Sequence, residues 1–116
     1  MMIEDKKVTA FSFSAESNHY FILRERRPVA VDLITWARWF ETADRRIARD
    51  EVGKATTVST VFIGCNHQFG KGPPLVFETM VFNGKLDGEC QRYSSYDDAE
   101  IGHAAMVRKC RKADEP

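Results

Sequence analysis

Three ionisable side chains of the sequence, His67, Glu78 and His103, could together carry out acid-base chemistry. A histidine titrates near neutral pH, and a carboxylate that bonds to its ring fixes the tautomer, so such a pair can act as a general base. If the fold brings these side chains together, the sequence predicts a small hydrolase-like enzyme. In the alternative interpretation, His103 is a core histidine satisfied by one hydrogen bond, for example to Glu78, while His67 and Glu78 stabilise a loop.

No established catalytic motif accompanies these residues. The sequence contains no G-x-S-x-G, H-E-x-x-H, P-loop or Rossmann pattern. We therefore favour a protein that is not an enzyme, and we predict no cofactor.

Cys65 and His67 have the spacing C-x-H and could bind zinc together with His103 or Glu78, because thiolate, imidazole and carboxylate all bind this metal. One such pair is little support for a metal centre. We interpret Cys65 as a small buried apolar residue and predict no metal site.

The loop over residues 64–74 is the main candidate binding site, with Asn66, His67, Phe69 and Lys71 as its contact residues. Loops of this length in compact domains are often functional. Glycine lets backbone amides approach an anion closely, and Lys71 adds a positive charge. The loop is therefore expected to bind a protein or a small anionic ligand, with Phe69 either an exposed anchor or a lid over the core.

Two strand-like runs, 56–63 and 75–82, flank this loop. Both are rich in β-branched and aromatic residues, and neither has a polar side, which is typical of strands in the middle of a sheet. Glu78 is the exception within the second run. Asn83 and Gly84 then form a turn signal before a third short strand over 89–93.

Two amphipathic helices are expected. The first follows Asp32, a typical N-cap, and its apolar periodicity continues to Arg49 or Asp50, which is about four turns. The second opens at a capping box of Ser95 and Asp98, ends near Lys112, and carries His103 on its apolar face.

The first helix offers a second candidate binding surface. Trp39 lies at the edge of the apolar face, and Arg38 and Arg45 lie on the opposite face. Tryptophan is enriched at binding hot spots, so these residues could contact a partner or phosphate groups. A solvated face is the alternative, because several acidic residues dilute the positive charge.

The order of elements predicts an α+β fold, in which a small antiparallel sheet of four or five strands carries two helices on one face. This order includes strands over 8–13 and 20–24 and an extended segment over 29–31 after Pro28. The other sheet face would be free to bind. We expect one domain over 1–116, with 1–7 and 113–116 frayed.

Composition narrows the classes of partner. The 116 residues include 17 basic and 17 acidic side chains, so no overall field attracts nucleic acid or anionic membrane. The charged N-terminus and the absence of a long apolar run argue against a signal peptide or a membrane span. We therefore expect a cytoplasmic protein with Cys65, Cys90 and Cys110 reduced.

Several segments resemble a family of small, uncharacterised proteins encoded by bacteriophages and prophages. They are Trp36 to Phe40, Val58 to Gly64 with Asn66 and His67, Pro73 to Phe82, Arg92 to Ser94, and Gly102 with His103. Family members tend to carry aspartate where this chain has Asn66, which leaves no acid at that position.

This resemblance implies a phage origin and action in the cytoplasm of a bacterial host, and it implies no chemistry. The expected function is stoichiometric binding of a host protein. The expected effect is inhibition of a bacterial defence system, as with anti-CRISPR proteins. The alternatives are sequestration of a small anionic ligand by the loop over 64–74 and the hydrolase-like site. A second copy of the chain could also cover the free sheet face or an exposed edge.

Overall fold

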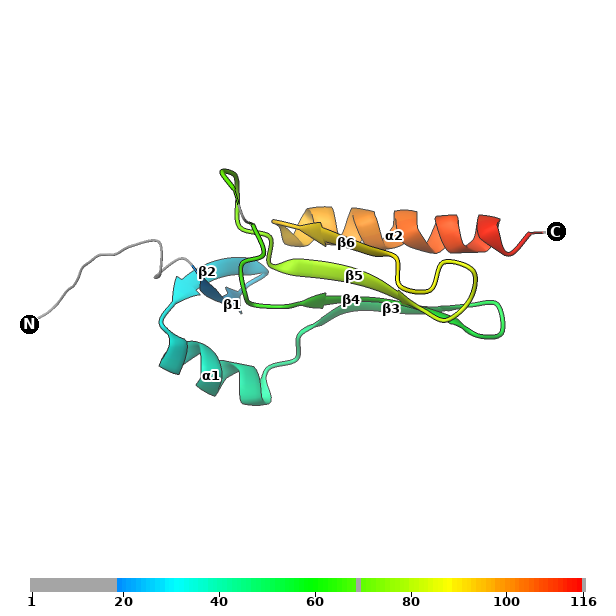
Figure 1. Ribbon diagram of the computed structural model, residues 1–116. Coiled ribbons are helices and arrows are strands. Elements are labelled where there is room, and N and C mark those ends of the chain that lie inside the picture. The colour runs from blue at the N-terminus through cyan, green and yellow to red at the C-terminus, as the bar shows by residue number, and fades with distance from the viewer. Residues whose placement is uncertain (1–18, 69, 116) are drawn as a thin grey trace, which may run out of the picture.

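The computed structural model describes residues 19–68 and 70–115 (Figure 1). The strand expected over 8–13, the frayed segment 1–7 and Phe69 lie outside the described residues. In chain order the elements are β1 (Tyr20–Arg24), β2 (Arg27–Val31), α1 (Leu33–Thr42), β3 (Arg46–Val52), β4 (Thr56–Phe62), β5 (Phe77–Phe82), β6 (Cys90–Tyr93) and α2 (Tyr96–Ala113).

The strands form two antiparallel sheets, so the protein has an α+β fold as expected. The main sheet has the order β3-β4-β5-β6, and β1 pairs with β2 in a separate hairpin. The turn of that hairpin has positive φ at both Glu25 and Arg26, which suits the twist of paired strands. The Phe21 N–H donates to the Gly64 carbonyl at 2.8 Å and so joins the hairpin to the end of the main sheet.

The first helix is shorter than its apolar periodicity predicts. Asp32 caps it as expected, since its Oδ1 accepts from the Thr35 N–H at 2.8 Å, but the helix ends at Thr42 and the chain continues as β3. The segment expected to form the last two turns of the helix pairs with β4 as a strand instead, because tertiary context overrides local helix propensity. Ile47, placed on the helix face by the pattern, instead lies at a bulge in β3 and packs against the core.

The second helix and the central strands agree with the sequence. The Ser95 hydroxyl accepts from the Asp98 N–H at 3.0 Å, and α2 continues to Ala113. The runs 56–63 and 75–82 form β4 and β5, the two inner strands of the main sheet. Their outward side chains are nevertheless only partly buried, because α2 covers one face of the sheet alone.

The core lies between α2 and one face of the main sheet (Figure 1). One buried cluster lies toward the C-terminal half of α2 and consists of Val52, Val58, Val81, Met106, Val107 and Cys110. A second cluster toward the β1-β2 hairpin is built on the aromatic pair of Phe62 and Phe77, whose ring centroids are 5.2 Å apart. The smaller helix α1 lies beside β1 and reaches the second cluster through Trp39.

Neither helix covers the opposite face of the main sheet within the described chain (Figure 1). We call this the outer face. It is formed by Arg46, Arg49 and Glu51 on β3, Thr57, Ser59 and Val61 on β4, Glu78, Met80 and Phe82 on β5, and Cys90 and Arg92 on β6. Within the same residues, no helix combines the length and the apolar character needed to cross a bilayer.

Candidate functional site

His103 lies on the covered side of the sheet and is only 5% exposed. Its ring bridges two strands, because Nδ1 lies 2.7 Å from the Thr60 hydroxyl and Nε2 lies 2.7 Å from Oδ2 of Asp50. These contacts satisfy both ring nitrogens. The core-histidine interpretation is thus confirmed, with Thr60 and Asp50 as partners.

Glu78 points to the outer face, away from His103. Its carboxylate accepts from Nε of Arg92 at 3.0 Å and from the Cys90 thiol at 3.4 Å. The hydrogen bond suggested between His103 and Glu78 is therefore wrong. Side chains alternate along a strand, so Thr79 takes the inward position and Glu78 takes the outward one.

His67 serves its own loop. Its Nδ1 lies 3.0 Å from the Cys65 carbonyl oxygen and donates to it, and its backbone N–H donates to the Leu75 carbonyl at 3.1 Å. The three proton-transfer candidates are thus not brought together, because each bonds to a different set of partners.

The loop amides expected to face an anion are largely engaged by the loop itself. Asn66 Oδ1 accepts from the backbone N–H groups of Gln68 at 2.8 Å and Leu75 at 3.1 Å. Gln68 in turn accepts from the Gly70 N–H at 3.2 Å. Lys71 is exposed at the tip, where only its side chain offers a charge.

The described part of this loop does not bring together enough ligands for a metal ion. Cys65 and His67 lie in it, but within the described ranges no three histidine, cysteine, aspartate or glutamate side chains gather closely enough to hold a metal ion. Cys65 is half-buried, and burial raises the pKa of its thiol.

The candidate surface on the first helix is also divided. Trp39 packs edge-on against Phe62 with ring centroids 5.6 Å apart, so it belongs to the core. Arg45 lies after the helix end, with its guanidinium 3.8 Å from the centroid of the Phe40 ring. Arg38 remains exposed on α1, and Arg49, where the helix was expected to end, lies on β3.

Trp36 is half-buried between Tyr20 and Phe40, at ring distances of 5.2 and 4.6 Å. Its indole lies close to the loop, since a Cβ on Gly64 would be 2.6 Å from Nε1. The Nε1 atom is buried without a hydrogen-bond partner in the described part of the chain.

A chain of buried hydrogen bonds crosses all four strands of the main sheet. Tyr93 on β6 donates to the Thr79 hydroxyl on β5 at 3.1 Å, and Thr79 bonds to Thr60 on β4. Thr60 then meets His103, whose far nitrogen meets Asp50 on β3. Burial is the main cause that raises the pKa of Tyr93, which keeps its proton in place.

One assignment of protons satisfies every member of this chain. An ionised Asp50 only accepts, so Nε2 of His103 donates to it, and Nδ1 of the neutral ring accepts from Thr60. Thr60 then accepts from Thr79, and Thr79 accepts from Tyr93. Thr60 is 0% exposed and His103 only 5%, so the hydroxyl and the ring are closed to a substrate, whereas Asp50 at the edge strand is half exposed. The arrangement fixes the position of α2 on the sheet.

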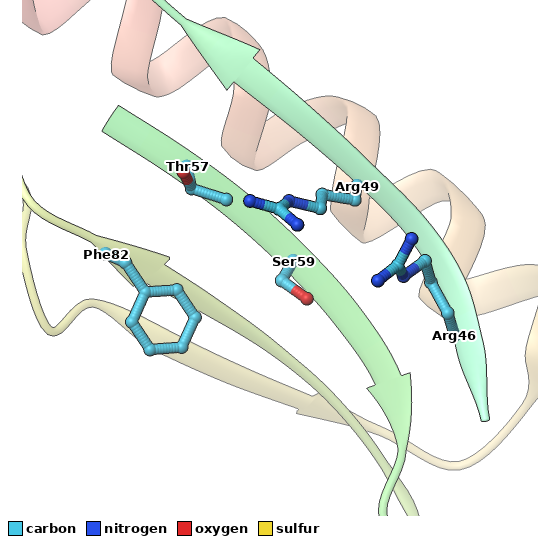
Figure 2. A pocket seen from close by; sticks show the side chains of 5 residues that line it. All are labelled: Arg46, Arg49, Thr57, Ser59 and Phe82. Atoms are coloured by element: carbon cyan, nitrogen blue, oxygen red, sulfur yellow. The ribbon is translucent and has the colours of Figure 1, made fainter. Parts of the chain in front are cut away.

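A hollow on the outer face was not predicted from the sequence. It has a volume of about 300 Å³ and is lined by Arg46, Arg49, Thr57, Ser59 and Phe82. Figure 2 shows both arginine side chains pointing from β3 toward β4, with Arg49 over that strand and Phe82 on its other side. The alternation of outward Arg49 and Glu51 with inward Asp50 and Val52 could have revealed β3.

Two contacts hold part of this hollow in place. Arg49 forms an ion pair with Glu51 at 3.1 Å, and the Thr57 hydroxyl donates to Glu51 at 2.9 Å. Arg46 makes no ion pair with any residue that the structure describes. The arrangement leaves one guanidinium available to a ligand.

Comparison of the chain with protein-family models, with curated proteins and with solved structures finds no match.

Proposed function

We propose that this protein acts by stoichiometric binding of another protein, and that the outer face of the main sheet is its contact surface. The observation that carries this proposal is the exposure of this face beside a well-packed core. Phe82 is 49% exposed on it, although phenylalanine is normally buried. Exposed apolar area bordered by polar residues is typical of protein interaction sites.

The composition of the outer face suits an interface. Met80 is the next outward residue to Phe82 on β5, and Val61 lies opposite Glu78 further along the same face. Both are half-buried, and charged side chains lie around them. Aromatic residues, methionine and arginine are enriched at protein interfaces. The packing of α2 on the other side holds the four strands in place before binding, so little conformational entropy is lost in forming a complex.

The positions of the ionisable candidates also favour binding over catalysis. His103 is buried among Thr60 and Asp50, Glu78 pairs with Arg92 on the outer face, and His67 bonds to backbone. The histidine with a carboxylate partner, His103, is buried, and the ring of His67 bonds to a backbone carbonyl instead of a carboxylate.

A different protein fits the outer face better than a second copy of this chain. The face carries three arginines, Arg46, Arg49 and Arg92, and two glutamates, Glu51 and Glu78. A symmetric dimer would place this positive excess against itself, which is unfavourable. From the resemblance to phage-encoded proteins, we take the partner to be a bacterial host protein and the setting to be the host cytoplasm, with inhibition of a defence system as the effect.

The experiment is affinity capture from bacterial lysate with three forms of the tagged protein: wild type, Phe82→Glu and Ile101→Glu. Ile101 is the matched control, because it is an apolar residue 67% exposed on α2, away from the outer face. We expect a protein that is captured by wild type and by Ile101→Glu and lost with Phe82→Glu. Capture of the same proteins by all three forms, or of none by wild type, would contradict the proposal.

A further inference from the structure

We propose that the hollow over β3 and β4 receives one carboxylate side chain of the partner, with an apolar side chain of the same segment against Phe82. This inference rests on the proposed function, because it names the chemistry of the partner at the same face. The expected partner segment therefore places an aspartate or glutamate next to an apolar residue.

The register of the sheet brings the polar groups of the hollow together. Where β3 pairs with β4, Arg49 lies opposite Ser59 and Arg46 lies opposite Val61. The guanidinium of Arg49 lies over β4 between Thr57 and Ser59, and that of Arg46 lies between β3 and β4 on the Ser59 side (Figure 2). A guanidinium presents paired N–H donors that match the two oxygens of a carboxylate, and the Ser59 hydroxyl can add a third donor.

The charged side chains of the hollow favour a ligand with a single negative charge. Arg49 is paired with Glu51, whose other oxygen accepts from Thr57. Arg46 is the cation of the hollow that lacks such a pair within the described chain. The hollow with Glu51 thus carries one net positive charge, which one carboxylate neutralises. A phosphate dianion would leave a net negative charge beside Glu51, which is unfavourable.

Phe82 supplies the apolar half of the site. It is the cross-strand neighbour of Thr57, and Thr57 is in turn the neighbour of Glu51. Phe82 lines the same hollow as Arg46 and Arg49 but from the far side of β4, so one short segment can set an apolar side chain against Phe82 and a carboxylate beside the arginines.

The test is a titration followed by backbone and arginine side-chain NMR signals, with the capped dipeptide acetyl-Glu-Phe-amide as the probe. The neutral analogue acetyl-Gln-Phe-amide and inorganic phosphate are the comparison probes. We expect saturable shifts at Arg46, Arg49, Ser59 and Phe82, with affinity for the glutamate probe ~10-fold above that for the glutamine probe. Phosphate is expected to bind more weakly than the glutamate dipeptide.

Two variants locate the binding. Arg46→Gln is expected to remove the preference for glutamate over glutamine, while Arg38→Gln, which removes an exposed cation on α1, leaves it unchanged. Equal binding of the two dipeptides, tighter binding of phosphate, or no localised shifts would overturn the carboxylate site. Those results would not change the prediction that Phe82→Glu abolishes capture of a host protein. The binding surface and the carboxylate site are therefore tested independently.

Discussion

The Nε2 atom of His103 on α2 lies 2.7 Å from Oδ2 of Asp50 on β3, and this contact joins residues 53 positions apart in the chain. It is one end of the buried hydrogen-bond chain that continues through Thr60 and Thr79 to Tyr93. The chain fixes α2 on one face of the main sheet and leaves the outer face uncovered.

Replacement of His103 by alanine is expected to destabilise the fold. His103→Ala leaves the buried Thr60 hydroxyl without its acceptor, and an unsatisfied buried group costs about 1–3 kcal/mol. Urea unfolding measures this difference. His67→Ala is the matched control, because its ring bonds only to a half-buried loop carbonyl, and its cost is expected to be smaller. Equal costs would contradict the role assigned to the buried chain.

Gly102→Ala is expected to destabilise the protein, although alanine favours a helix over glycine. A Cβ at this position would lie 2.2 Å from Cε1 of Tyr93, whose hydroxyl is held by Thr79. The ring must move, which costs about 1–3 kcal/mol. Urea unfolding of Gly102→Ala, Tyr93→Ala and the double variant forms a cycle. The double variant should be more stable than the sum of the single changes predicts, and additive effects would rule out this contact.

The N-cap of α1 predicts a pH dependence of stability. Hydrogen bonds from the backbone N–H of Thr35, and then from its hydroxyl, lower the pKa of Asp32 below its ordinary value of 3.8. A carboxyl group with a lowered pKa in the folded state stabilises the fold above 3.8, and this stabilisation is lost as the pH falls through the lowered pKa.

Asp32→Ala should therefore cost about 1 kcal/mol at neutral pH, and less near pH 3. Asp32→Asn retains the cap but cannot ionise, so it serves as the control for the charge. Chemical unfolding across this pH range compares the three forms. A difference between wild type and Asp32→Ala that stays constant with pH would contradict the ionised cap.

Glu78 is expected to slow the alkylation of Cys90. Burial raises the pKa of the Cys90 thiol, and the hydrogen bond to Glu78 and the charge of Glu78 raise it further. Because the thiolate is the reactive form, Glu78→Gln should speed alkylation of Cys90 by iodoacetamide ~3-fold near pH 8.

Cys65 is the internal control, since burial is the cause that raises its pKa and Glu78 contributes nothing to it. Peptide mass spectrometry reads both sites in one sample. An unchanged ratio of the Cys90 and Cys65 rates in Glu78→Gln would show that the carboxylate does not hold the thiol proton.

Much of the fold is predictable from local signals. Asp32 and Ser95 are N-caps in the structure, and the runs 56–63 and 75–82, rich in β-branched and aromatic residues, form the two inner strands. The end of α1 was not predictable in the same way. The helical spacing of Ala43 and Ile47 continues past Thr42, and only the pairing of β3 with β4 converts that stretch into a strand.

The site depends on the same strand, which explains why the sequence did not reveal it. Arg46 and Arg49 reach the outer face only because β3 alternates its side chains across the sheet, whereas a helix would have grouped Arg49 with Arg38 and Arg45. The periodicity of β5 likewise separates Glu78 from His103, although the residue types make both candidates for acid-base chemistry.

The most direct test of the outer face as the binding surface is the affinity of a captured partner for three purified forms of the protein, measured by calorimetry. These forms are wild type, Phe82→Ala and Ile101→Ala. We predict that Phe82→Ala weakens the complex ~30-fold, as expected for an interface hot spot, and that Ile101→Ala leaves its affinity unchanged. Equal affinity of all three forms, or a loss confined to Ile101→Ala, would contradict binding through the outer face.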